Sequence, residues 1–297
     1  MTKTGFIAIV GRPNVGKSTL LNQILGEKVA IVSKRPQTTR NRITGILTQG
    51  EDQFVFLDTP GLHRPRTKLG DFMVKTTDSA IGEADAAILV VEPREAVGDI
   101  EQTVIDRLKE AKIPAVLAIN KIDAVTPVNV AKTIAAYSEA FDFDAVVPMA
   151  AKSGKNVSIL VDECRRYLAE SPWFFPDDIV TDQPERQIVS EVIREKILRL
   201  LSEEIPHGTA VVIEAFEESE RLIKIRAEIF CERDSHKRIL LGKQGSMIKT
   251  IGTYAREDLE KFFGVKVHLD LWVKVKEKWR DSAFQLANFG YNKKDYE

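Results

Sequence analysis

Short apolar runs alternate with amphipathic stretches over residues 1–170. The runs cover residues 5–11, 42–49, 53–59, 85–92, 113–121 and 144–151, and several are too uniformly apolar to have a solvent-exposed face. Between them, residues 17–25, 101–111 and 130–141 carry apolar side chains at spacings of three and four, which is typical of helices. Buried strands that alternate with helices form mostly parallel sheets covered on both faces. The pattern therefore predicts a doubly wound α/β domain over residues 1–170.

A different pattern begins after residue 170. Residues 170–187 include three prolines, so we interpret residues 171–186 as a linker, and we expect Trp173, Phe174 and Phe175 to pack between two domains. The remaining pattern predicts a helix over 188–205, strands over 209–216 and 222–231, helices over 235–242 and 246–263, a strand over 266–276 and a short final helix. This order indicates a compact α+β domain over residues 187–297.

The composition agrees with two soluble domains. A chain of 297 residues is long enough for both, and its hydrophobic fraction of 43% and charged fraction of 29% are ordinary for a globular protein. No apolar run approaches the roughly 18 residues of a membrane-spanning helix, and the amino terminus lacks a signal-peptide pattern. Cys164 and Cys231 stand apart from any metal-binding or redox motif, so we expect both to be structural. These features predict a cytoplasmic protein.

The net charge of −1 conceals a basic region. Between residues 233 and 280, twelve Lys and Arg stand against six Asp and Glu, which gives this region a net charge of +6. A basic region of this kind favours contact with nucleic acid, whereas the average charge of the chain would argue against it.

The segment GRPNVGKS matches the phosphate-binding pattern GxxxxGK followed by Ser or Thr, and it lies between a predicted strand and a predicted helix. In such loops, backbone N–H groups surround phosphates at the amino terminus of a helix. We expect Lys17 to contact the β- and γ-phosphates and the Ser18 hydroxyl to bind Mg²⁺. The nucleotide-binding residues predicted here are Gly11, Arg12, Pro13, Asn14, Val15, Gly16, Lys17, Ser18 and Thr19.

The segment NKID, residues 120–123, selects the base. A carboxylate at Asp123 would accept hydrogen bonds from the guanine N1–H and exocyclic amine, whereas adenine would leave this acid unpaired. We expect Asn120 to contact the base and to connect loops, and we expect the stem of Lys121 to lie against the ring. The loop AAKSG would supply a backbone N–H to the guanine oxygen, and its candidate residues are Ala150, Ala151 and Lys152.

These motifs, together with KRPQTTRNR over residues 34–42 and DTPGL over residues 58–62, resemble the Era family of ribosome-assembly GTPases, and the resemblance covers nearly the whole chain. It implies that one threonine closes over Mg²⁺, for which we favour Thr39 and keep Thr38 as the alternative. It also implies that Asp58 holds Mg²⁺ through water. Ala150 stands where the family more often has serine, in a loop that acts through its backbone. The resemblance further implies that the Gly61 N–H contacts the γ-phosphate. The DTPGL residues implied to bind nucleotide are Asp58, Thr59, Pro60, Gly61 and Leu62.

Leu62 stands where Ras-type GTPases carry a water-positioning glutamine. Leucine cannot orient water, but phosphoryl transfer depends largely on positioning and charge neutralisation. The resemblance implies that Asn14 binds a potassium ion beside the phosphates in place of an arginine, and the alternative is that Asn14 only shapes the loop. A catalytic role for His63 is less favoured, because polar side chains on mobile loops are often only solvated. The implied catalytic residues are Lys17, Asn14, Thr39 and Gly61.

The segment GKQG, residues 242–245, joins two predicted helices in the second domain. The order of elements resembles a KH domain of the prokaryotic type, in which a GxxG loop clamps the backbone of about four nucleotides. We expect Trp272 to pack within the domain and not to stack on bases. The predicted RNA-binding residues are Gly242, Lys243, Gln244, Gly245, Lys237, Arg238 and Lys249.

The favoured hypothesis is a switch that binds RNA and hydrolyses GTP slowly. By resemblance, its partners are GTP and GDP, Mg²⁺ and K⁺, the 3′ end of 16S ribosomal RNA and the small ribosomal subunit, whose late assembly it would assist. Family analogy alone adds a peripheral association with membranes, and we expect a monomer. One alternative is a GTPase serving tRNA modification, which would need an additional chemical site. The other is an RNA-binding module with a vestigial nucleotide site, which the intact Lys17, Ser18, Asp58 and Asp123 disfavour.

Overall fold

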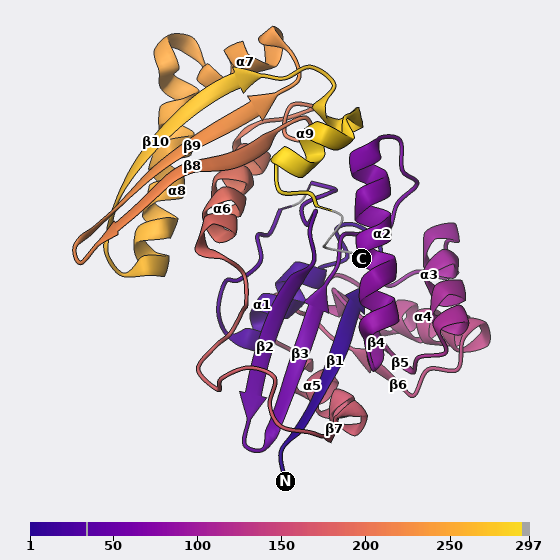
Figure 1. Cartoon of the computed structure of the whole chain (residues 1–297). Helices are drawn as coiled ribbons and strands as arrows, with labels where there is room; N and C mark the ends of the chain where they lie inside the picture. Colours follow the sequence, from indigo (N-terminus) through magenta and orange to yellow (C-terminus); the bar gives the residue numbers. More distant parts are fainter. Residues whose placement is uncertain (34, 293–297) are drawn as a thin grey trace.

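The structure is a computed structural model in which residues 1–33 and 35–292 are described. Two domains are visible in Figure 1, the amino-terminal one in the lower part of the view and the carboxyl-terminal one at the upper left. Within the described ranges, no helix is both long and apolar enough to span a membrane.

One sheet organises the amino-terminal domain. Its strand order is β2-β3-β1-β4-β5-β6, and all neighbours are parallel except β2 and β3. The short β7 pairs antiparallel with the start of β1. The mostly parallel sheet predicted from the sequence is therefore confirmed. The strands are β1 (Lys3–Val10), β2 (Ile43–Gln49), β3 (Asp52–Asp58), β4 (Ala86–Val91), β5 (Ala115–Ile119), β6 (Ala145–Pro148) and β7 (Ala169–Glu170).

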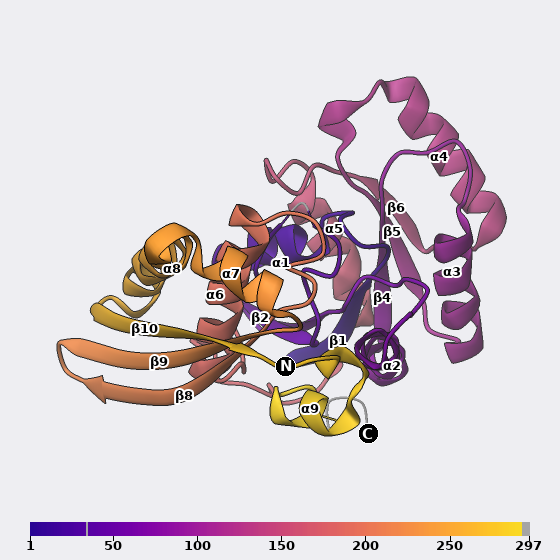
Figure 2. The ribbon, with the colours of Figure 1, turned by 90° about the horizontal axis from the view of Figure 1, so that it is seen from above.

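Helices cover both faces of this sheet, as Figures 1 and 2 show. Ile7 and Ile9 of β1 belong to a core shared with α1 and α5, while Ala8 and Val10 belong to a second core shared with α2, α3 and α4. Successive side chains of a strand point to opposite faces, so a uniformly apolar strand needs cover on both sides. The helices are α1 (Lys17–Leu25), α2 (Lys68–Glu83), α3 (Asp99–Ala111), α4 (Pro127–Ala140) and α5 (Val157–Cys164), with short 3-10 helices η1 (Ile122–Ala124) and η2 (Arg165–Tyr167).

Neither α2 nor α5 is among the helices that the sequence pattern predicts. In α2, the buried Leu69, Phe72 and Met73 are followed by Thr76 and Thr77, which weaken the apolar periodicity. Both threonines are nevertheless buried, because their hydroxyls donate to carbonyl groups one turn earlier in the helix. The polar Thr76 and Thr77 therefore lie on the side of α2 that faces the core.

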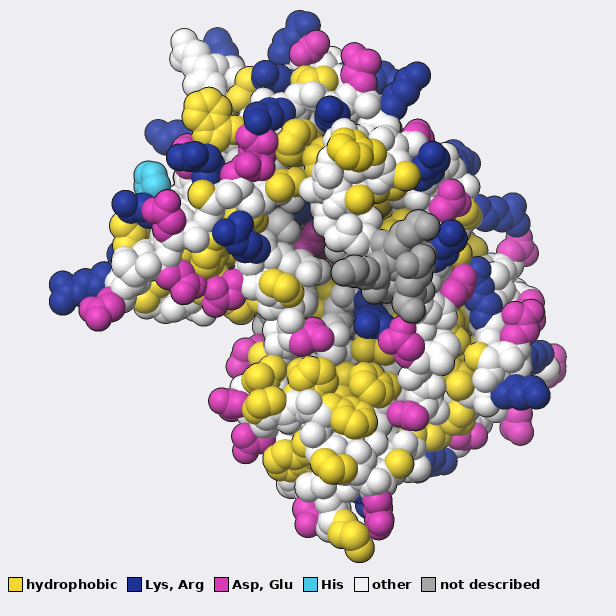
Figure 3. All heavy atoms as spheres, viewed as in Figure 1, with side chains coloured by type: hydrophobic (Ala, Val, Ile, Leu, Met, Phe, Trp, Pro, Cys, Tyr) yellow, Lys and Arg dark blue, Asp and Glu magenta, His cyan; other side chains and the backbone are white. Residues whose placement is uncertain are grey.

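The linker lies on the amino-terminal domain. Gln53 is fully buried and holds the linker by donating to Phe175 O and by accepting from the N–H groups of Phe174 and Phe175. The Phe174 ring stacks on Phe6 at 5.3 Å, Phe175 packs on β3 and α2, and Trp173 donates to a carbonyl in the β2–β3 turn. The prediction that these aromatic residues pack between domains is wrong, because they cover an apolar part of the sheet instead. Figure 3 shows apolar side chains gathered on this face of the lower domain.

The carboxyl-terminal domain has two layers. Its sheet has the order β10-β9-β8, with β9 parallel to β10 and antiparallel to β8. Helices α6, α7 and α8 share one apolar core with these strands, so the predicted α+β domain is confirmed. The elements are α6 (Glu185–Leu200), β8 (Ala210–Ser219), β9 (Leu222–Cys231), α7 (Asp234–Leu241), η3 (Lys243–Gly245), α8 (Ser246–Phe263), β10 (Lys266–Val275), η4 (Trp279–Asp281) and α9 (Ala283–Asn288).

Two single-residue predictions in this region have different outcomes. Trp272 is 58% exposed, so the prediction that it packs within the domain is wrong. Strand alternation places it on the side of β10 opposite the buried Val273. Cys231, like Cys164 in the first domain, is buried and free, as expected for a structural thiol.

A further apolar cluster is shared by the two domains. Phe72 and Met73 of α2 pack with Trp279 and Tyr291, which follow β10 in the second domain. Figure 1 shows α9 beside the upper end of α2. We call this group the C-terminal aromatic cluster. It fixes α2, which follows the DTPGL segment, against the second domain.

Candidate functional site

A cavity of about 1000 Å³ opens where β1 and β5 end. The carboxyl edge of a parallel sheet is where ligands bind in open α/β folds. Many predicted nucleotide-binding residues come together in its wall, although they lie on separate segments of the sequence. These are Pro13, Asn14, Gly16, Lys17, Ser18, Thr19, Thr39, Gly61, Asn120, Lys121, Asp123 and Lys152.

Two glycines allow the backbone to approach the cavity closely. Gly16 has a φ of 102° directly before α1 begins, and a Cβ there would lie 2.3 Å from Asn120 Nδ2. A Cβ on Gly61 would lie 2.5 Å from the Pro13 nitrogen. Because any other residue would collide, both positions require glycine. The amino terminus of α1 then stands at the cavity, where helix N–H groups attract anions.

Lys17 in the cavity wall and Asp58 behind it are buried side chains of opposite charge. Lys17 Nζ donates to Gly11 O at 3.2 Å and to Arg12 O at 2.9 Å. Burial lowers the pKa of Lys17 to about 8 and raises the pKa of Asp58 to about 6. Burial therefore makes both charges costly, and an anion at Lys17 with a cation at Asp58 would relieve that cost.

The hydroxyl groups of Ser18 and Thr39 meet the carboxylate of Asp58. Ser18 Oγ donates to Asp58 Oδ2 at 2.7 Å and lies 2.9 Å from Thr39 Oγ1. Asp58 Oδ1 is buried and has no hydrogen-bond partner among the described residues. Hydroxyl and carboxylate oxygens are the ligands that Mg²⁺ prefers. Thr38 instead donates to Arg35 O at 2.7 Å, so the geometry favours Thr39 over Thr38 for this group.

The other end of the cavity is organised by Asn120. Its amide donates to Val15 O and accepts from the Ala151 N–H, both at 2.8 Å, so the expected connection between loops is present. Lys121 Nζ donates to Asn14 O at 2.7 Å, and Asp123 is exposed in the cavity wall. Because the Ala150 N–H is bonded to Lys155 O and the Ala151 N–H to Asn120, we narrow the guanine-facing donor to Lys152.

The GKQG segment forms a tight turn between α7 and α8. Gly242, Gln244 and Gly245 have positive φ angles of 71°, 52° and 78°. A Cβ on Gly242 would lie 2.7 Å from the Met247 nitrogen, whereas one on Gly245 would meet nothing within 4 Å. Gly242 is therefore needed by the turn itself, and Gly245 leaves space for the approach of another molecule.

The basic residues beside this turn keep their charge uncompensated. Among the described residues, no ion pair involves the predicted RNA-binding residues Lys237, Arg238, Lys243 and Lys249. Other basic residues of the domain have an acidic partner, as in the pairs Lys274–Glu228 and Arg280–Glu232. Unpaired cations around a GxxG turn are suited to phosphate contacts.

Comparisons with known proteins decide the family. Residues 6–121 match the family of 50S ribosome-binding GTPases, and residues 204–280 match the KH domain. GTPase Era from Clostridium novyi strain NT is 51% identical over 292 residues, covering 98% of this chain and 99% of the relative. The chain belongs to the Era family. It is therefore a GTPase with a KH domain.

Solved structures agree with this assignment. A variant of Aquifex aeolicus Era bound to GDP and AlF4⁻ superposes with a TM-score of 0.94 at 37% identity, covering 98% of this chain and 99% of that one. Era in complex with MgGDPNP and nucleotides 1506–1542 of 16S ribosomal RNA gives the same TM-score, identity and coverage. A second relative by sequence, GTPase Era from Clostridium kluyveri, is 50% identical over 98% of this chain and all of the relative.

In this Era-family GTPase, several predicted nucleotide-binding residues lie behind the cavity wall. Leu62 is 4% exposed and packs in the apolar core with Val10 and Leu89, so its side chain faces away from the nucleotide. The Thr59 hydroxyl donates to Ile9 O, and Arg12 is 3.5 Å from Glu101 of α3. The predicted residues that do not line the cavity are Gly11, Arg12, Val15, Asp58, Thr59, Pro60, Leu62, Ala150 and Ala151.

The Era-family KH domain also supplies part of the cavity wall, which the sequence does not indicate. Leu198 and Arg199 of α6 line the cavity. They do so beside residues 31–33, Arg35 and residues 37–39 of the first domain. Arg199 donates to Val32 O at 3.2 Å, and Glu195 accepts from the Val32 N–H at 3.1 Å. The partners are more than 160 positions apart, and only the fold brings them together.

Arg40 joins the GTPase domain to the KH domain most directly. It lies in the loop whose threonine is expected to close over Mg²⁺, here called the switch loop (residues 35–42). It is 1% exposed, and its guanidinium donates to Thr209 O at 2.7 Å, His207 O at 2.9 Å and Tyr291 Oη at 3.1 Å. The Trp279 ring centroid is 5.8 Å away. Arg40 is thus enclosed by the KH domain directly after Thr39, the residue placed beside Asp58.

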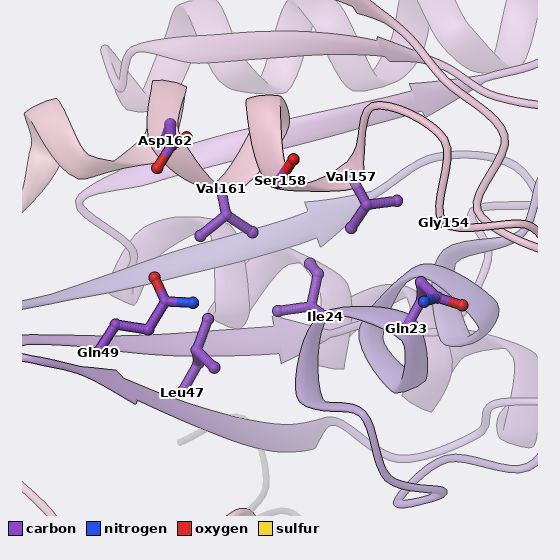
Figure 4. A pocket seen from close by; sticks show the side chains of 9 residues that line it. All are labelled: Gln23, Ile24, Leu47, Gln49, Gly154, Val157, Ser158, Val161 and Asp162. Carbon is purple, nitrogen blue, oxygen red and sulfur yellow. The ribbon is translucent and has the colours of Figure 1, made fainter.

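A second cavity of about 280 Å³ lies between α1, β2 and α5. Figure 4 shows Ile24, Leu47, Val157 and Val161 pointing toward one another, with polar side chains at the rim. None of the phosphate-loop residues lines it. It is therefore separate from the nucleotide site.

Proposed function

We propose that this chain is a GTP-operated switch that binds the 3′ end of 16S ribosomal RNA and assists late assembly of the small ribosomal subunit. The observation that carries the proposal is the enclosure of Arg40 by the KH domain next to the cluster of Ser18, Thr39 and Asp58. A change at the nucleotide then moves a loop that the RNA-binding domain holds. The RNA is proposed from the relative whose complex contains nucleotides 1506–1542 of 16S ribosomal RNA.

In the nucleotide site, Lys17 would neutralise the β- and γ-phosphates, and the Gly61 N–H would contact the γ-phosphate. Ser18 and Thr39 would bind Mg²⁺ directly, with Asp58 acting through water. The unpartnered Asp58 Oδ1 and the raised pKa of Asp58 fit a cation at this position. Mg²⁺ would supply charge stabilisation of the transferring phosphoryl group. Asp123, Asn120 and the Lys152 N–H would select guanine.

Potassium is proposed as a second cation at Asn14. This residue lines the cavity, and its positive φ of 66° bends the loop backbone there. A monovalent cation at this position would neutralise charge that an arginine neutralises in other GTPases. The support for it is family resemblance together with this geometry.

The KH turn would hold RNA through backbone contacts at Gly242, Lys243, Gln244 and Gly245. The uncompensated charges of Lys237, Arg238, Lys243 and Lys249 would neutralise phosphates, and the exposed Ile239 would border the groove that receives bases. We further propose that the chain works in the cytoplasm as a monomer, with a secondary, peripheral association with membranes that rests on family analogy alone. A role in tRNA modification is disfavoured, because the cavity carries no additional chemical site within the described residues.

The proposal is tested by crosslinking the full chain to total cellular RNA with either a non-hydrolysable GTP analogue or GDP bound. The expected result is enrichment of the 16S 3′ end, with a different yield for the two nucleotides. Enrichment of tRNA would support the alternative function. Equal yields for the two nucleotides would contradict the coupling.

A further inference from the structure

With Leu62 buried in the core, the side chain that follows Gly61 is not available to orient the attacking water. Gln37 of the switch loop lines the nucleotide cavity, as do Thr39 and Gly61, the residues assigned above to Mg²⁺ and the γ-phosphate. A carboxamide can accept a hydrogen bond from water and does not need to remove its proton. We propose that Gln37 is the water-positioning residue of this GTPase. This inference rests on the proposed roles of Thr39 and Gly61.

The orientation of the Gln37 amide follows from its contact with His63. His63 Nδ1 lies 3.0 Å from Gly61 O, and since a carbonyl only accepts, Nδ1 carries the proton. In the neutral imidazole, Nε2 is then an acceptor. Gln37 Nε2 lies 3.3 Å from His63 Nε2 and donates to it. The Gln37 Oε1 is left as the acceptor that a water molecule requires.

The KH domain holds the backbone of the same residue. Gln37 has a φ of 58°, a conformation that non-glycine residues rarely adopt without support. Arg194 of α6, itself 1% exposed, donates to Gln37 O at 3.4 Å and also to Thr38 O. Gln37 is therefore held at its side chain by His63 and at its backbone by the RNA-binding domain. His63 and Arg194 are positioning residues, because they act through Gln37.

In the reaction, Gln37 Oε1 accepts a hydrogen bond from the water and directs its oxygen toward the γ-phosphorus. The new bond forms between this oxygen and phosphorus while the bond from phosphorus to the β–γ bridging oxygen breaks. The electron pair of the broken bond stays on GDP, and the water proton passes to a phosphate oxygen, which gives GDP and inorganic phosphate. Gln37 remains unchanged. The missing glutamine is thus supplied by a different loop.

The test compares Gln37→Ala, His63→Ala and the double variant with the unaltered full chain. Gln102→Ala on α3 is a matched control, because the hydrogen bond of that side chain within the described residues is local, to Asp106. Single-turnover hydrolysis should fall roughly 10- to 100-fold in Gln37→Ala, as expected when a transition-state hydrogen bond is removed. Affinity for a non-hydrolysable GTP analogue and for GDP should stay within about twofold, while affinity for GDP with aluminium fluoride falls with the rate.

His63→Ala should slow hydrolysis less than Gln37→Ala, and the double variant should be no slower than Gln37→Ala alone. Unchanged hydrolysis in Gln37→Ala would overturn the inference. So would an equal loss of GTP-analogue affinity and rate, which indicates that Gln37 only closes the switch loop. A further loss in the double variant would assign the water to His63. These outcomes are independent of the RNA-crosslinking result, so failure here leaves the proposed RNA function standing.

Discussion

Replacing Arg40 by methionine should uncouple nucleotide binding from RNA binding. The guanidinium is buried among Thr209 O, His207 O, Tyr291 Oη and the Trp279 ring. Methionine keeps an apolar stem but removes every donor. Burial lowers the pKa of Arg40, yet guanidinium groups remain charged in proteins. The substitution therefore removes a charge as well as three hydrogen bonds.

The magnitude follows from the acceptors that remain. Two backbone carbonyls lose a buried donor, and each such loss costs about 1–3 kcal/mol. Part of this free-energy cost is offset, because the variant no longer has to desolvate the charge of the guanidinium. We expect a net loss of about 2–3 kcal/mol in docking of the switch loop on the KH domain, which corresponds to about 30- to 150-fold in that equilibrium.

The assay measures affinity of the full chain for an oligonucleotide of the 16S 3′ end, with a GTP analogue or GDP bound. The ratio of the two affinities should approach one in Arg40→Met, and the effect of RNA on nucleotide affinity should fall by the same factor. Arg42→Met is the control, because Arg42 lies on the same loop but pairs with Glu83 at the surface. A folded Arg40→Met with an unchanged ratio would refute this reasoning, as would an equal effect of Arg42→Met.

Three further predictions concern the separate parts of the site. Gly245→Asp should abolish RNA binding in a filter-binding assay and spare GTP binding in calorimetry, while the control Gly264→Asp, also at positive φ with open space, should leave both intact. Loss of GTP binding in Gly245→Asp would contradict the assignment of RNA binding and GTP binding to separate sites. Because burial lowers the pKa of Lys17 to about 8 and the phosphates bind its charged form, calorimetry should show GTP-analogue affinity falling as pH rises above about 8, by up to about tenfold per unit; a flat profile would count against Lys17 as the phosphate ligand. Hydrolysis should be several-fold faster in K⁺ than in Na⁺ at equal ionic strength, and Asn14→Ala should remove the difference; equal rates in the unaltered chain would exclude the potassium site.

Parts of the fold and the site could be predicted because their signals are local. The phosphate loop, NKID and GKQG are contiguous motifs whose backbone shape depends on glycines and neighbouring strands, and the structure places Lys17, Ser18 and Asp123 around one cavity. By contrast, α2 escaped prediction because its buried threonines bond to their own helix. The packing of the linker aromatic residues was predicted wrongly, because the backbone of Phe174 and Phe175 is held by Gln53, a polar residue more than 120 positions earlier.

The sequence by itself determined the two domains, the GTP-binding motifs and the KH turn, since each depends on residues near one another in the chain. The tertiary structure alone decided how the domains communicate. Three contacts join residues that are separated by 26 to 251 positions. They are the enclosure of Arg40, the hydrogen bonds of Arg194 to the switch loop and the contact between Gln37 and His63. Such contacts depend on how two folded domains pack, and no local pattern encodes that packing. The tertiary structure also turned Leu62 into the core and brought a glutamine from another loop to the cavity that Leu62 does not reach.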